Sequence, residues 1–106
     1  MYNNKARVAM KRAGSDELEL HEIYASVEGF ETLMDLYYEI VAIAGLPDGI
    51  QIVTNADARE EGLPENMMGI HGNMIFYRTT NGAVTSLADT DIQAIKRLIR
   101  TRGNHQ

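Results

Sequence analysis

The chain has 106 residues and a net charge of −5, and apolar residues make up 44% of it against 24% for charged ones. This size fits one domain, 1–106, with a single modest core, and the composition is far from that of disordered chains. The absence of cysteine excludes disulfides, thiolate nucleophiles and thiolate metal sites. The longest apolar run, 40–46, is far shorter than the roughly 20 residues that span a bilayer. We therefore expect a cytoplasmic protein without membrane contact, ordered over about 5–102 and with short flexible termini.

The charges are unevenly distributed along the chain. No Lys or Arg lies between Arg12 and Arg59, although acidic residues are frequent there. Most of the bases lie near the two ends of the chain: Lys5, Arg7, Lys11, Arg12, Lys96, Arg97, Arg100 and Arg102. If these ends meet in space, as domain termini often do, the molecule has an acidic side and a basic side.

The first elements form a predicted hairpin. Apolar and polar residues alternate over 6–11, which is typical of a half-buried strand, and a turn follows at 13–16. Alternation resumes over 17–25, which predicts the second strand.

A helix is predicted over 27–36, because Val27, Phe30, Leu33 and Met34 share one helical face behind a potential N-cap at Ser26. The next segment, 37–43, is ambiguous. Its apolar residues could prolong the helix so that 30–44 is one rod, but its aromatic and β-branched composition favours a strand, which we prefer.

The second half of the chain predicts two strands, a long loop and a helix. The turn Pro47-Asp48-Gly49 precedes a β-branched strand over 50–54, an exposed loop covers 55–66, and a last strand runs over 70–79 before a turn at 80–83. The apolar stripe of 92–99 predicts a C-terminal helix that ends at Gly103, with Ala88 a poor N-cap and Ser86 an alternative one.

Together these elements predict an α+β fold in the order β-β-α-β-β-β-α. We expect an antiparallel or mixed sheet of about five strands, with two helices packed on it and covering one face.

Candidate binding residues gather around the long loop. The motif His71-Gly72-Asn73 could bring an imidazole close to a ligand, or it could mark a bulge at the start of a strand. The loop 62–66 could be a rigid ligand or partner surface, or simply a structural turn. The candidate ligand or partner residues are Asn55, Glu65, Asn66, His71 and Asn73.

Catalytic and metal sites are not predicted. His21, His71 and His105 lack the spacing of metal ligands, and no phosphate-binding loop, nucleophile elbow or other catalytic motif is present. We expect no cofactor, no metal, no catalytic residue and no enzymatic activity.

The C-terminal helix offers a second candidate surface. Lys96, Arg97 and Arg100 could contact nucleic-acid phosphates, or they could merely complement the negative end of the helix dipole.

The chain also resembles an uncharacterised domain family of small phage and conjugative-element proteins. The resemblance covers about 18–95 in chain order and is carried by Ser26-Val27-Glu28, Tyr37-Tyr38-Glu39-Ile40, Pro47-Asp48-Gly49, 50–55, Gly62-Leu63-Pro64-Glu65-Asn66, Gly72 and Ser86-Leu87-Ala88-Asp89. It departs from the family pattern at Asp35-Leu36, where glycines are usual, and at Ala88. The resemblance implies a mobile-element origin but no assigned activity.

Three functional hypotheses follow. The first is a non-enzymatic binding module that acts on a host protein, modulating host defence or transcription. The alternatives are a small-ligand, nucleotide-like binding protein that uses the loop residues, and a nucleic-acid-binding accessory protein. Homo-oligomerisation through a sheet edge is open in each case.

Overall fold

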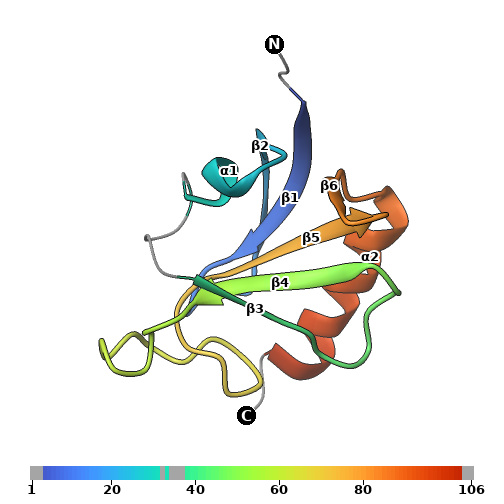
Figure 1. Cartoon of the computed structure of the whole chain (residues 1–106). Helices are drawn as coiled ribbons and strands as arrows, with labels where there is room; N and C mark the ends of the chain where they lie inside the picture. The colour runs from blue at the N-terminus through green and yellow to red at the C-terminus, as the bar shows by residue number, and fades with distance from the viewer. Residues whose placement is uncertain (1–3, 32, 34–37, 104–106) are drawn as a thin grey trace.

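The computed structural model describes residues 4–31, 33 and 38–103, and it shows one antiparallel sheet flanked by two helices (Figure 1). The sheet has six strands in the order β2-β1-β5-β4-β3, with β6 paired to β5. Along the chain the elements are β1 (Lys5–Lys11), β2 (Leu18–Tyr24), α1 (Val27–Glu31), β3 (Tyr38–Val41), β4 (Ile50–Asn55), β5 (Met74–Thr80), β6 (Ala83–Thr85), α2 (Asp89–Leu98) and the π-helical turn η1 (Ile99–Gly103). The predicted α+β class is confirmed.

Each face of the sheet carries its own apolar cluster, because alternate side chains of a strand point to opposite faces. On the face of α2 the strands contribute Ala9, Ile52, Met74 and Phe76, which pack with Ile92, Ile95 and Leu98 of the helix. On the other face, Val8, Met10, Val53 and Ile75 pack with Phe30 of α1. The expectation that both helices cover one face is therefore wrong, and the central strands are apolar on both faces because both are covered.

Helix α1 is short and lies tightly against β2. The ring of Phe30 lies 4.9 Å from the ring of Tyr77, centroid to centroid, and closes the cluster on this face. A Cβ on Gly29 would lie 1.9 Å from the carbonyl oxygen of Tyr24, so this close approach requires glycine. The predicted helix extended to 36, but the described helix ends at Glu31, and Thr32 and 34–36 lie outside the described residues.

The ambiguous segment is a strand, as preferred. β3 pairs with β4 in an antiparallel register from Tyr38 opposite Asn55 to Val41 opposite Ile52. The alternative of one helix over 30–44 is therefore wrong, because backbone groups paired across a sheet cannot also form helical hydrogen bonds.

Strand β6 is the element that sequence reasoning missed, since Ala83 was assigned to a turn. β6 pairs with the end of β5 where β1 diverges, and its continuation binds β1: the Arg7 amide donates to Ser86 Oγ, and the Leu87 amide donates to the Arg7 carbonyl. Ser86 therefore holds β1 rather than capping α2.

The last long strand also begins later than predicted, at Met74.

The N-terminus of α2 is held by an ion pair with β5. The Asp91 carboxylate accepts hydrogen bonds from Nε and Nη2 of Arg78, at 2.8 and 2.6 Å, and from the Ala88 amide at 2.8 Å. Asp91 thus satisfies the amide of the N-cap residue Ala88, whose own side chain makes no capping bond. Within the described residues, no helix has the length and hydropathy of a membrane span.

Candidate functional site

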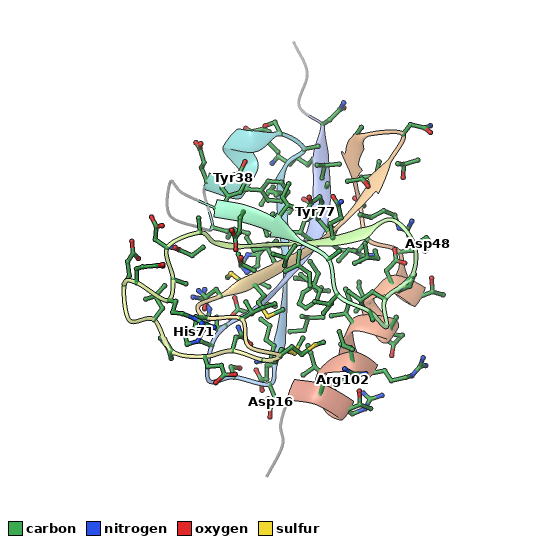
Figure 2. All side chains as sticks on the ribbon, turned by 60° about the horizontal axis from the view of Figure 1, so that its bottom comes forward. Asp16, Tyr38, Asp48, His71, Tyr77 and Arg102 are labelled. Atoms are coloured by element: carbon green, nitrogen blue, oxygen red, sulfur yellow. The ribbon has the colours of Figure 1, made fainter. Side chains whose placement is uncertain are left out.

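The loop 56–73 leaves the end of β4 and folds back over the α2 face of the sheet. Met67 belongs to the core cluster on that face, and Ile70 packs against it. Figure 2 shows His71 of this loop toward the end of the sheet where Tyr38 lies, with Asp48 at the opposite end. Two apolar anchors therefore fix the loop beside the sheet.

Asn66 is a structural clamp between the loop and β1. Its Nδ2 donates to the carbonyls of Lys11 and Gly72 at 2.9 and 2.8 Å, while its Oδ1 accepts a bond of 2.5 Å from Lys11 Nζ. Lys11 is only 1% exposed. Burial lowers the pKa of Lys11, and the nearby carboxylate of Asp16 opposes this effect. The amide of Asn66 thus solvates a buried ammonium.

Asn73 and His71 also bind the protein itself. Asn73 Oδ1 accepts from the Ala13 amide at 3.0 Å, which ties the loop to the β1–β2 turn. His71 Nδ1 lies 2.9 Å from the Leu63 carbonyl, so this nitrogen carries a hydrogen and donates it to the carbonyl oxygen. These contacts match the structural interpretation of the motif.

Gly72 connects these two residues in a conformation that favours glycine. Its φ is +81°, and a Cβ here would lie 3.2 Å from Leu63 Cδ1. Its amide donates to the Pro64 carbonyl at 2.8 Å.

A polar pocket of about 300 Å³ lies between the loop and β3. Its lining includes the predicted residues Asn55 and His71, but not Glu65, Asn66 or Asn73. Glu65 is exposed on the loop and forms a β-bridge with His71. The structure therefore brings together two of the five candidate residues in this pocket.

Four further polar lining residues were missed by the sequence reasoning: Glu39, Thr54, Arg59 and Glu60. Glu39 and Thr54 are directly opposite each other in the β3–β4 register. Their neighbours along each strand point to the α1 face, so Glu39 and Thr54 both point to the α2 face. The alternation within 37–43 could have identified Glu39, but only the strand pairing shows which residue lies opposite it.

Thr54 is an almost enclosed residue of the pocket lining. It is 3% exposed and lies opposite Glu39 in the β3–β4 register. A hydroxyl oxygen has two lone pairs, so it can accept a hydrogen bond from a group bound in the pocket.

β3 is the end strand of the sheet, and no strand among the described residues pairs with its outer side. Ile40 points to the α1 face and is 53% exposed, while Glu39 points toward the pocket on the α2 face. An unpaired edge with an exposed apolar side chain is a site where another strand can add.

The surroundings of this edge are strongly acidic. Residues 38–71 contain six carboxylates (Glu39, Asp48, Asp57, Glu60, Glu61 and Glu65) and one base, Arg59. Their net charge of −5 equals that of the whole chain. This acidic stretch overlaps only in part with the base-free stretch between Arg12 and Arg59 from which the sequence predicted an acidic side.

The basic residues do not form one surface. Lys96 and Arg100 line a pocket of about 570 Å³ together with Asp16 and Glu17. Near the other end of β1, Arg7 Nη2 lies 3.2 Å from Asp89 Oδ1.

Strand β2 adds a fourth acidic residue. Glu19 accepts from Arg12 at 2.6 Å and lies 3.0 Å from His21 Nε2. The bonds from Arg12 and His21 hold the pKa of Glu19 below its ordinary value. Of the three cations that sequence reasoning assigned to nucleic acid, Lys96 and Arg100 have acidic neighbours, Asp16 and Glu17.

Metal ligands do not converge within the described residues, where no three His, Asp or Glu side chains form a group that could hold an ion. Comparisons of the chain with protein-family models, with curated proteins and with solved structures find no match. The resemblance to a mobile-element family therefore stays a prediction.

Proposed function

We propose that the protein is a non-enzymatic binding module that acts on a host protein by accepting one of its strands at the β3 edge. The observation that carries this proposal is the combination found at β3: an outer edge with which no described strand pairs, the half-exposed Ile40 on one face and a polar pocket on the other. Strand addition uses main-chain hydrogen bonds for affinity and pockets for alternate side chains for specificity.

The alternatives have less support. A nucleotide-like ligand would need several polar groups to converge, but Asn66 and Asn73 are engaged in binding β1 and the β1–β2 turn. Phosphates would be repelled by Asp16 and Glu17, which share a pocket with Lys96 and Arg100.

The family resemblance gives the proposal its biological setting. A small protein of a phage or conjugative element acts inside a host cell, so a host protein of defence or transcription is the expected partner. The concentration of negative charge near β3 would accelerate encounter with a basic partner.

Matched variants at the two sheet edges test this function. Ile40→Asp places a charge on β3, whereas Leu20→Asp places the same charge on β2, at a side chain of similar exposure (53% and 49%). Each tagged variant is incubated with a lysate of the cells in which the protein is made, and captured proteins are identified by mass spectrometry. Circular dichroism confirms that both variants are folded.

The proposal predicts that the wild-type chain and Leu20→Asp capture the same partner and that Ile40→Asp does not. Capture of no specific partner by the wild-type chain would refute the binding function. If Leu20→Asp abolishes capture of the partner and Ile40→Asp retains it, the interface lies at β2 and the use of β3 is refuted.

A further inference from the structure

We propose that the pocket beside β3 selects a basic side chain, so that the strand accepted at this edge carries a lysine or arginine whose cationic group binds Glu39 and Thr54. This inference rests on the proposed function and names the chemistry of the partner.

The argument begins with the direction of side chains at the edge. Glu39 and Thr54 are opposite each other on β3 and β4 and line the same pocket. Side chains of a strand added outside β3 would alternate between the two faces. Those on the α1 face would meet Ile40, and those on the α2 face would enter the pocket next to Glu39.

The second step is the hydroxyl of Thr54. Thr54 is 3% exposed and lines the pocket opposite Glu39. A hydroxyl can accept a hydrogen bond from an ammonium or guanidinium group. The Glu39 carboxylate opposite it supplies the charge, so the pair offers a cation two acceptors.

Charge decides between a basic and an acidic guest. Glu39 and Glu60 line the pocket against one cation, Arg59. Even with one carboxylate balanced by Arg59, the other remains for a guest cation. Glu39 and the loop 56–73 together carry five carboxylates and one base, a net charge of −4 beside the pocket. An acidic side chain would be repelled, and a neutral one would leave the Glu39 carboxylate without a counter-ion.

A peptide selection tests this chemistry without a known partner. A random-peptide library is selected on the wild-type chain and counter-selected on Ile40→Asp, so that only peptides dependent on the β3 edge remain. The strongest peptide is synthesised, and its affinity is measured by calorimetry and its position by amide chemical shifts.

The expected peptide is extended, perturbs the amides of β3 and contains a Lys or Arg. Replacing that residue by norleucine, which keeps the apolar stem and removes the charge, should weaken binding roughly ten- to a hundredfold. Glu39→Gln should weaken the basic peptide by a similar factor and Thr54→Val by several-fold. Asp48→Asn is the matched control: it removes a carboxylate from the same hairpin but outside the pocket lining, and should change affinity little.

The outcomes separate this inference from the proposed function. A peptide that perturbs β3 but binds equally well with norleucine refutes the basic specificity and leaves the strand-accepting edge in place. An equal loss for Asp48→Asn and Glu39→Gln also refutes it, since the attraction would then be general. Failure of the library to yield any peptide dependent on Ile40 refutes both.

Discussion

Replacing Asp91 by asparagine removes one negative charge from the junction of β5 and α2 and keeps the size of the side chain. The carboxylate is 3% exposed and accepts three hydrogen bonds, two from Arg78 and one from the Ala88 amide. The Arg78 Nε bond and the Ala88 bond both go to Oδ2, so an asparagine oxygen placed there could keep them. Its NH₂ group would then face Arg78 Nη2, and two donors would meet where Oδ1 now accepts.

The expected loss follows from these bonds. A hydrogen bond to a charged group contributes about 1.5–3 kcal/mol, and removing one partner of a buried ion pair costs about 3–5 kcal/mol. Because asparagine keeps part of the network, we expect Asp91→Asn to lower the free energy of unfolding by about 2–4 kcal/mol. Urea unfolding followed by far-UV circular dichroism measures this change.

The chain offers a matched control in the same helical turn. Asp89 is also paired with an arginine, Arg7, but its side chain is 92% exposed. An exposed pair typically contributes less than about 1 kcal/mol, so Asp89→Asn should change stability little. Equal losses for Asp89→Asn and Asp91→Asn would refute the reasoning that burial of the pair determines its contribution.

The pH dependence gives a second readout of the same group. Hydrogen bonding to Arg78 is the main cause that holds the pKa of Asp91 below its ordinary value, and burial opposes it. The folded state therefore binds fewer protons at this site than the unfolded state, in which the pKa is about 3.9. The stabilisation is complete above about pH 4 and is lost as the pH falls through the folded pKa. The stability difference between wild type and Asp91→Asn should shrink accordingly in acid.

Two further predictions concern the loop. Gly72→Ala should destabilise the protein by about 2 kcal/mol, and by more than Gly62→Ala does. Both glycines have a positive φ, but of the two only Gly72 would bring a Cβ against a side chain, with Leu63 Cδ1 at 3.2 Å. Equal shifts of the melting temperature for the two variants would contradict this. Asn66→Leu should lower the free energy of unfolding by about 3 kcal/mol or more, since it leaves the buried Lys11 ammonium without its acceptor. Adding Lys11→Met to this variant should restore part of the lost stability, measured by urea unfolding. An additive double variant would show that Asn66 does not act through Lys11.

The site was only partly visible in the sequence, for reasons that differ between residues. Asn55 and His71 were identified by their place at a turn and beside a glycine, and they do line one pocket. Asn66 and Asn73 have the same local signals but serve as clamps, because their partners on β1 and the β1–β2 turn are distant in sequence. Loop chemistry alone does not distinguish these two roles.

Local sequence determined most of the elements, because apolar periodicity, turn residues and β-branched composition act within a few neighbouring residues. It correctly indicated the first hairpin, the strand at Tyr38–Val41, the α+β class and the C-terminal helix. Only tertiary structure placed the two helices on opposite faces, paired β6 with the end of β5, and set Glu39 opposite Thr54. These features depend on strand order and register, which arise from burial and backbone pairing between segments far apart in the chain.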